Sequence, residues 1–334
     1  MSTRFDCEEF LKKWYWMNLT DLAKTYALRR TENLSLPKAL QKNNIVNAGI
    51  VLGATSNLAF LNKDFFVIGG PCISDCYETF TLESIAEISN LLNTAKILNK
   101  KAIVFVGVKE EKIRTNKNWK KRGNDFEELI NKIAKIIKND NFLVVRSDNS
   151  QVEKILQKFL ALLDKELTKE QLFNLYNIGK TRPYSEEKVK CGFDYSLHKR
   201  FIITYLPEFA KEITNSTKTI PLLACENLQQ VKALKQAQII SKKIGNKKIL
   251  PEQLIHLPFP NLKGDNRMYR SNSENKIFIS DDIQKIKALV KKIPENVFFY
   301  YANIWPKELL TKPIKSREDF TQFFSSLKKK LEVN

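Results

Sequence analysis

The stretch 65-FFVIGGPCISDCYETFTLESIAEISNLLNTAKIL-98 sets the architecture of this chain. It opens with a short apolar run that two glycines stop, which is the pattern of a buried strand. Thr81 is a good helix N-cap, and apolar residues recur behind it at helical spacing. The stretch therefore predicts a strand, a glycine turn and a helix.

Further apolar, β-branched runs repeat this unit along the chain. We expect strands in GIVLG from residue 49, AIVFVGV at 102–108, FLVVR at 142–146, TIPLLACE at 219–226 and LIHLPF at 254–259. A long helix is expected from Asp125 to about Lys138, between two of these strands. Strands and helices that alternate at these lengths predict an α/β fold with a Rossmann-like parallel sheet.

The remaining segments divide the chain into parts. Its 334 residues, 43% of them hydrophobic, suit one large domain with an appendage. We expect a helical, amphipathic N-terminal extension at 1–47 and a Rossmann-like catalytic-type domain at 48–282, with a helical insertion at about 151–218. A reduced, basic helical C-terminal domain is expected at 283–334.

The composition limits the partners and the compartment. A net charge of +19 favours polyanions, although lysine-rich composition drift explains the charge almost equally well. No apolar run reaches membrane-spanning length and no secretory h-region is evident, so we expect a cytoplasmic or organellar-matrix protein without a membrane partner. Five dispersed cysteines and two histidines predict neither a disulfide framework nor a metal site.

The segment 112-KIRTNKNWKKR-122 has six cations, one tryptophan and no acidic residue. Cations neutralise phosphates, and an indole ring stacks on a nucleic-acid base. The segment follows a strand that leads to the ligand edge of the predicted sheet. We expect RNA-binding contacts from Lys112, Arg114, Lys117, Trp119, Lys120, Lys121 and Arg122; the alternative is a solvated loop with one anchoring aromatic.

Two loops have the build of ligand sites. In 264-GDNRMYRSNSENKIFISDD-282, a glycine turn leads to two arginines and a hydroxyl, then to a strand-like IFI and an acidic helix start. Gly69 and Gly70 let a ligand approach the backbone after the first central strand, although a tight strand-to-helix turn explains them as well. Neither the GxGxxG nor the P-loop signature is present.

The order of these parts resembles the class I aminoacyl-tRNA synthetases, in the tryptophanyl/tyrosyl branch. The resemblance rests on GGP at 69–71, ACENLQQVKALKQAQIISKKIG at 224–245, IHLPFPNLKG at 255–264 and RMYRSNSENKIFISDD at 267–282. It is good over 254–293, tolerable over 49–108 and weak elsewhere. It implies a KMSKS-like catalytic loop with Arg267, Arg270 and Ser271, and a substrate site with Gly69, Gly70, Glu226 and Asn227.

The chain departs from the family at both ATP motifs. When GxPSxxxxHxGH is anchored on Pro71, its serine becomes Cys72 and its HxGH becomes Tyr77-Glu78-Thr79-Phe80. The KMSKS lysines have become arginines, and the first serine has become Tyr269. The family's pocket pair of an acid and a glutamine corresponds to Glu226-Asn227, and the segment after the loop is short for anticodon-binding helices.

Three hypotheses follow from the resemblance. The first is a degenerate synthetase-like protein that binds tRNA or another structured RNA and has lost efficient adenylation. The second is an active, divergent tryptophan– or tyrosine–tRNA ligase that uses ATP and Mg²⁺. The third is a charged-tRNA transferase of the cyclodipeptide-synthase type, in which Cys72 or Ser74 lies where that family has its nucleophilic serine. The family also implies a homodimer.

Overall fold

The computed structural model describes residues 80–106 without 98, 119–151 without 147, and 276–331. It also describes the backbone of five further strands and a few single positions, 154, 168, 170 and 262–263. The five strands are 45–46, 50–53, 65–69, 220–225 and 252–256. Most of the expected insertion at 151–218 and most of the expected extension at 1–47 lie outside the described residues.

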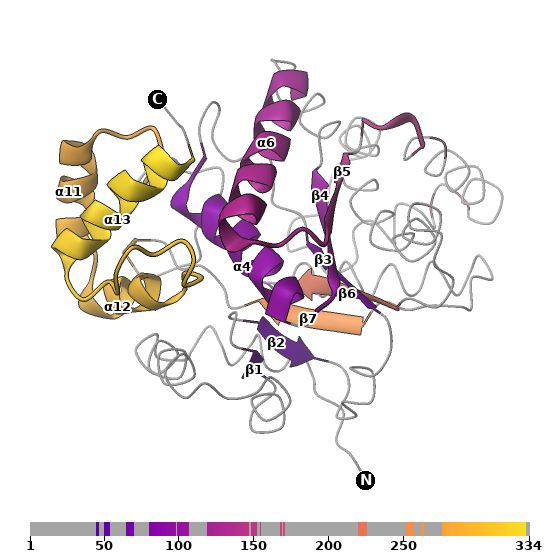
Figure 1. The fold of residues 1–334 in the computed structure, drawn as a ribbon, viewed down its shortest axis with the longest axis horizontal. Coiled ribbons are helices and arrows are strands. Elements are labelled where there is room, and N and C mark those ends of the chain that lie inside the picture. Colours follow the sequence, from indigo (N-terminus) through magenta and orange to yellow (C-terminus); the bar gives the residue numbers. More distant parts are fainter. Residues whose placement is uncertain are drawn as a thin grey trace, which may run out of the picture.

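Seven described strands form one sheet (Figure 1). They are β1 (Ile45–Val46), β2 (Ile50–Gly53), β3 (Phe65–Gly69), β4 (Lys101–Val106), β5 (Phe142–Arg146), β6 (Ile220–Cys225) and β7 (Glu252–His256). Their order in the sheet is β1-β2-β7-β6-β3-β4-β5. The pairs from β7 to β5 are all parallel, so the predicted Rossmann-like parallel sheet is confirmed.

One edge of the sheet differs from the prediction. β2 pairs with β7 in the antiparallel direction, and β1 pairs with β2 in the same way. Ile45 and Val46 belong to β1, so the expectation of helix throughout 1–47 is wrong at these two residues. Two β-branched residues favour a strand, but a strand of two residues is too short to show a period.

Two helices pack on one face of the sheet, where α4 (Leu82–Ile97) and α6 (Trp119–Ile137) lie side by side (Figure 1). The predicted N-cap of α4 is confirmed, because the backbone N–H of Ser84 donates to Thr81 Oγ1 over 3.2 Å. The helix expected from Asp125 begins at Trp119 instead. Lysine and arginine are good helix formers, so residues 119–122 of the basic run extend the helix, although Gly123 in its interior costs about 1 kcal/mol.

Both helices end on a residue in the left-handed region without using glycine. Asn99 has a φ of 53° after α4, and Lys138 has a φ of 59° after α6. The next backbone N–H returns into each helix, from Lys100 to Ala95 O over 2.8 Å and from Asn139 to Ala134 O over 3.0 Å. These are Schellman turns, and they lead the chain directly into β4 and β5.

Three helices follow the sheet in the chain and form the C-terminal helix cluster: α11 (Ile283–Lys292), α12 (Glu295–Asn303) and α13 (Arg317–Lys330). Aromatic side chains fill its interior, and the largest fully buried ones are Trp305, Tyr301, Phe320 and Phe324. The cluster is tied to the helices of the sheet. Lys96 of α4 donates to Glu308 Oε1 over 2.7 Å, and Lys132 of α6 donates to Leu331 O over 3.0 Å.

No helix among the described residues combines the length and the apolar character that crossing a bilayer requires.

Candidate functional site

The strand order places a candidate ligand edge at the carboxyl ends of β3 and β6. The chain runs outward from β3 through β4 to β5, then returns on the other side of β3 as β6 and β7. Ligands of open α/β sheets bind where the strand order reverses in this way. Gly69 ends β3, and Cys225 ends β6 directly before Glu226 in the chain. The predicted residues Gly70, Cys72, Glu226 and Asn227 lie outside the described residues.

The structure brings together the segments that flank the two ATP motifs. The backbone N–H of Ile279 donates to Phe80 O over 2.8 Å, and that of Leu82 donates to Ile277 O over 3.0 Å. Thr81 and Phe278 form an isolated antiparallel bridge between these bonds. The chain that leaves the KMSKS-like loop therefore pairs with the last residue of the HxGH-aligned stretch. Arg267, Arg270 and Ser271 of that loop lie outside the described residues.

Phe80, which aligns with the second histidine of HxGH, is half-buried and packs on an aromatic partner. Its ring centroid lies 4.8 Å from that of Phe126 in α6, with the planes at 84°. This is the edge-to-face geometry that aromatic pairs prefer. A phenyl ring offers no hydrogen-bond donor to a phosphate, so the side chain at this position packs and cannot bind phosphate.

Two aspartates fix the chain between this bridge and α11. Asp281 Oδ2 accepts a hydrogen bond from the backbone N–H of Phe278 over 2.9 Å. Asp281 Oδ1 forms an ion pair with Lys285 Nζ at 2.5 Å. Asp282 caps α11 by accepting from the backbone N–H groups of Gln284 and Lys285 over 2.8 and 2.9 Å. The bonds from Lys285 and then Gln284 lower the pKa of Asp282. The predicted acidic helix start is therefore confirmed.

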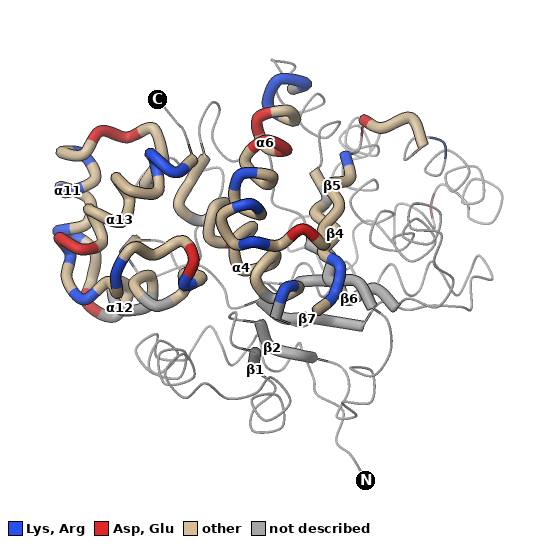
Figure 2. Tube along the Cα trace, in the orientation of Figure 1, with Lys and Arg blue, Asp and Glu red and all other residues tan. Residues whose placement is uncertain are grey.

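Three cations stand in the first turn of α6, the helix that follows β4 in the chain. Trp119 is its first residue, Lys120 and Lys121 are exposed, and Arg122 is half-buried. This turn has no acidic residue, and it is the blue upper end of α6 in Figure 2. Cations at a helix N-terminus oppose the helix dipole. The predicted contacts Lys112, Arg114 and Lys117 lie outside the described residues.

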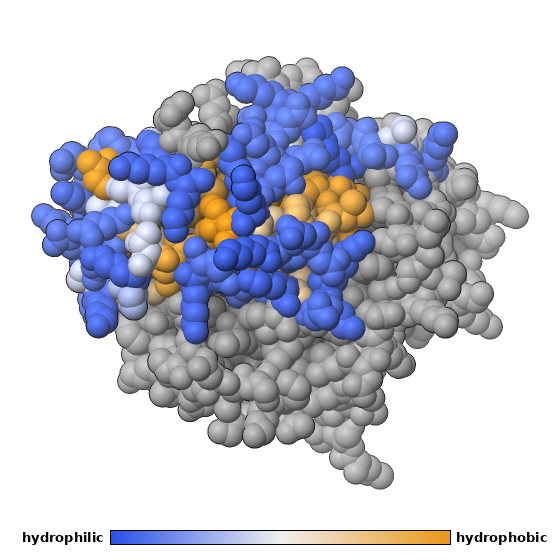
Figure 3. Space-filling view, in the orientation of Figure 1, coloured by the Kyte–Doolittle hydropathy of each residue, from blue (hydrophilic) through white to orange (hydrophobic). Residues whose placement is uncertain are grey.

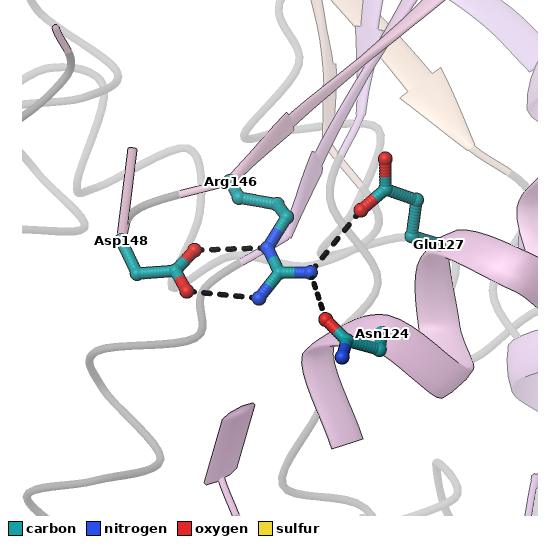
Figure 4. Close-up of polar contacts among 4 residues, drawn as sticks. All are labelled: Asn124, Glu127, Arg146 and Asp148. Atoms are coloured by element: carbon teal, nitrogen blue, oxygen red, sulfur yellow. Dashed lines mark hydrogen bonds and ion pairs between the residues drawn. The ribbon is translucent and has the colours of Figure 1, made fainter. Parts of the chain in front are cut away.

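An arginine clamp joins this end of α6 to the carboxyl end of β5 (Figure 4). Arg146 binds Asp148 with two bonds, from Nε to Oδ1 over 2.9 Å and from Nη2 to Oδ2 over 2.8 Å. Its Nη1 donates to Glu127 Oε2 over 3.1 Å and to Asn124 Oδ1 over 2.5 Å. The bonds to Asp148, followed by those to Glu127, raise the pKa of Arg146 against the opposing effect of burial.

The clamp was not anticipated from the sequence. All three guanidinium nitrogens of Arg146 are engaged within the protein, so this arginine acts as an anchor for α6. Planar, two-bond contact between arginine and carboxylate fixes orientation as well as distance. The sequence offered one indication of the clamp. Arg146 ends a predicted strand, Asp148 follows two residues later, and the helix that precedes this strand in the chain contains Glu127.

The predicted cofactors are not tested by the described part of the chain. Among the described residues, no three histidine, cysteine, aspartate or glutamate side chains are grouped so that they could hold a metal ion. The residues predicted to contact ATP or the amino acid, apart from the backbone of Gly69, fall outside that part. ATP and Mg²⁺ therefore remain predictions of the ligase hypothesis.

Comparison with known proteins identifies the fold. No protein-family model and no curated protein matches the sequence. Solved structures do match: a tryptophanyl-tRNA synthetase homolog from Entamoeba histolytica has 14% identity and a TM-score of 0.60, and covers 99% of this chain and 92% of its own.

Two further similar structures agree with this result. Tryptophanyl-tRNA synthetase from Plasmodium falciparum has 13% identity and a TM-score of 0.59, over 85% of this chain and 84% of its own. Tyrosyl-tRNA synthetase from Aeropyrum pernix has 12% identity and a TM-score of 0.54, over 89% and 92%. The expected resemblance is confirmed at the level of structure. The chain has the fold of a class I aminoacyl-tRNA synthetase.

Proposed function

We propose that this protein is a tryptophanyl/tyrosyl-tRNA synthetase-like protein that binds tRNA or another structured RNA and has lost most or all adenylation. The packing of Phe80 on Phe126, at the position of the family's second histidine, carries the proposal. The similar solved structures, which are tryptophanyl- and tyrosyl-tRNA synthetases, supply the context.

The loss of adenylation follows from the chemistry that the HxGH positions supply in the family. Adenylate formation needs preorganised donors at the developing phosphate charge, and loss of one such donor costs on the order of 10²–10³ in rate. Tyr77 and Phe80 replace two histidines, and Thr79 replaces the glycine that admits the adenine ring. These losses act on the same transition state, so we expect no efficient activation of an amino acid.

RNA binding is supported by the positive charge of the chain. The net charge is +19, and Lys120 and Lys121 in the first turn of α6 are exposed. Phosphate contacts of this kind are independent of sequence and weaken as salt rises. The Arg146 clamp fixes the N-terminal part of α6 to the carboxyl end of β5, on the side of the sheet where the acceptor end of an RNA would have to arrive in a synthetase-like protein.

The first experiment is ATP–pyrophosphate exchange with tryptophan and with tyrosine, beside an authentic synthetase. We expect no exchange above background from protein that circular dichroism shows to be folded. Clear exchange with either amino acid would overturn the loss of adenylation and support the active ligase. In that case Arg267, Arg270 and Ser271 would act on ATP, with Gly69, Gly70, Glu226 and Asn227 around the substrates.

The second experiment tests the RNA surface. The variant Lys120→Ala/Lys121→Ala/Arg122→Ala should weaken binding of a transcribed tRNA several-fold at low salt, and a triple variant of the exposed Lys307, Lys315 and Lys329 removes equal charge as its control. Equal loss of tRNA affinity in both variants would show that the α6 turn is not part of the interface.

Two further measurements test the remaining hypotheses. A covalent aminoacyl adduct on Cys72, formed from charged tRNA, would instead favour the transferase hypothesis. Analytical ultracentrifugation tests the predicted homodimer.

A further inference from the structure

Phe80 carries an aromatic ring that is only half-buried, directly before the start of α4. The chain leaves the carboxyl end of β3, passes through α4 and enters the amino end of the parallel strand β4. The start of α4 therefore lies on the side of the sheet where ligands of this fold bind. The backbone of Phe80 is fixed there, because its carbonyl accepts the N–H of Ile279 over 2.8 Å.

α6 holds the Phe80 ring from a second side. Phe126 is 4% exposed, and its ring meets that of Phe80 edge to face, with the centroids 4.8 Å apart. Such a contact uses at most one face of each ring. Phe126 is itself placed by the clamp, because Arg146 Nη1 donates to Asn124 and Glu127, which flank it in the chain. The two rings form a preorganised aromatic platform, which lowers the cost of ordering it around a ligand.

A cation stands on the same face of α6 as Phe126. Arg122 is four residues before Phe126, and residues at this spacing are neighbours on a helix surface. Arg122 is half-buried, and Lys121 next to it in the chain is exposed. An aromatic ring with a guanidinium one helical turn away supplies the two parts of a nucleotide site, a surface for the base and a charge for its phosphate.

The start of α4 beside the platform is poorly suited to a triphosphate. A helix N-terminus binds phosphates through backbone N–H groups that point at the ligand. Here the N–H of Leu82 donates to Ile277 O over 3.0 Å, and that of Ser84 donates to Thr81 Oγ1 over 3.2 Å. Two of the first donors of α4 are used within the protein, so the platform suits a ligand that is held by its base.

An RNA chain and a free nucleotide both offer a base and a phosphate. The net charge of +19 and the exposed Lys120 and Lys121 attract a chain of phosphates rather than a single one. The described side chains around the first turns of α6 form a hydrophilic surface along which such a chain can lie (Figure 3). A base can stack on a side chain only where it is not held inside a double helix. These observations favour an unpaired part of an RNA.

We propose that Phe80, held by Phe126, stacks on an unpaired base of an RNA, with Arg122 on the adjoining phosphate. This proposal rests on the proposed RNA-binding function and deepens it. It gives the position of the second HxGH histidine a new ligand, a nucleic-acid base in place of the phosphates of ATP.

The experiment compares four full-length proteins: wild type, Phe80→Leu, Phe80→Trp and Phe142→Leu. Leucine keeps an apolar side chain against Phe126 but removes the ring, whereas tryptophan keeps an aromatic surface. Phe142 is also half-buried but begins β5, at the opposite edge of the sheet, so its variant is the matched control. The probes are a hairpin RNA with an unpaired tail and the same hairpin without the tail. A fluorescent adenine analogue in the tail reports stacking, ATP is the competitor, and thermal melting verifies folding.

We expect Phe80→Leu to weaken binding of the tailed hairpin by a factor on the order of 10, because one stacked base is lost. Its affinity for the hairpin without a tail should not change. Wild type should quench the fluorescent base and Phe80→Leu should not. Phe80→Trp and Phe142→Leu should both behave as wild type.

Three other results would contradict the proposal. If Phe80→Leu and Phe142→Leu lose equal affinity, or if Phe80→Leu loses equal affinity for both hairpins, Phe80 has only a structural role and the RNA-binding function stands. If ATP displaces the fluorescent tail, the platform belongs to a free nucleotide. If wild type binds neither hairpin, this proposal and the proposed function both fail.

Discussion

The first turn of α6 and the face of α11 each carry three cations, but the protein holds them in opposite ways. Lys120, Lys121 and Arg122 stand at a helix N-terminus, against the dipole, whereas Lys291 and Lys292 stand at a C-terminus, with it. Both helices bury an apolar face, and each has a polar anchor: Arg146 binds Asn124 and Glu127 of α6, and Arg317 donates to Val290 O of α11.

This difference separates charge that the helix dipole opposes from charge that it favours. The dipole of α6 opposes the cations in its first turn, whereas the dipole of α11 favours Lys291 and Lys292. Those of α11 are partly explained by folding, and only Lys287 stands clearly outside that explanation. A surface cation whose local environment makes it unfavourable for folding is stronger evidence for a binding site than one that the environment stabilises.

The largest expected effect comes from removing the packing that holds α11. Phe320 is fully buried, and its ring centroid lies 6.1 Å from that of Phe298 and 6.2 Å from that of Phe324. Phe320→Ala should reduce the free energy of unfolding by about 3–5 kcal/mol, because a cavity remains in the aromatic core. Denaturant unfolding measures this loss, with exposed Gln322→Ala as the control. A loss below about 1 kcal/mol would contradict the packing described for the cluster.

The second effect concerns the clamp that anchors α6. Arg146→Ala leaves Asp148 and Glu127 without their partner, and the side chains of Arg146 and Asp148 are 18% and 17% exposed. We expect the free energy of unfolding to fall by about 2–3 kcal/mol. This is less than for a fully buried pair, because solvent reaches this one. RNA binding at the α6 turn should weaken as well.

The double variant Arg146→Ala/Asp148→Ala is the matched control for the clamp. It should recover part of the stability that Arg146→Ala loses, because one carboxylate no longer lacks a partner. If the double variant loses as much stability as Arg146→Ala and Asp148→Ala lose when their separate losses are added, the pair does not act as a unit.

A third prediction compares a cation at the N-terminus of α6 with a cation at the C-terminus of α11, through the sign of the change in stability when each is removed. Lys121→Gln should raise the stability of the protein by about 0.3–1 kcal/mol and weaken RNA binding. Lys291→Gln should lower stability by a similar amount. Thermal melting at low salt resolves the two signs. The same sign for both variants would show that the helix dipole does not distinguish the two positions.

The smallest effect is the pH dependence of the cap of α13. Ser316 and Asp319 form a capping box, and the hydrogen bonds from Lys312 and then Ser316 lower the pKa of Asp319 to about 2 from its ordinary 3.8. A lowered pKa in the folded state stabilises the protein above the ordinary value. That contribution should disappear as the pH falls from about 4 towards 2. Wild type and Asp319→Asn should therefore differ in melting temperature at pH 6 and converge near pH 2.

Much of the fold was accessible to sequence reasoning because each central strand is a short apolar run ended by a turn. The predicted N-cap at Thr81 and the acidic start of α11 were correct, since both depend on side chains next to the backbone groups that they cap. The start of α6 was wrong, because glycine and a basic run are compatible with a loop and with a helix. The left-handed turns at Asn99 and Lys138 were missed, because neither residue is the usual glycine.

Local pattern was sufficient for the strands, the main helices and the net charge, because each is a property of neighbouring residues or of composition. Tertiary structure alone decided that Phe80 packs on Phe126, that Arg146 reaches Asn124 and Glu127, and that Lys330 of the C-terminal basic run donates to a carbonyl. These contacts join residues that are from 19 to 46 positions apart in the chain, as in Arg146–Glu127 and Phe80–Phe126. No periodicity encodes such a meeting, because it depends on how the helices are placed on the sheet.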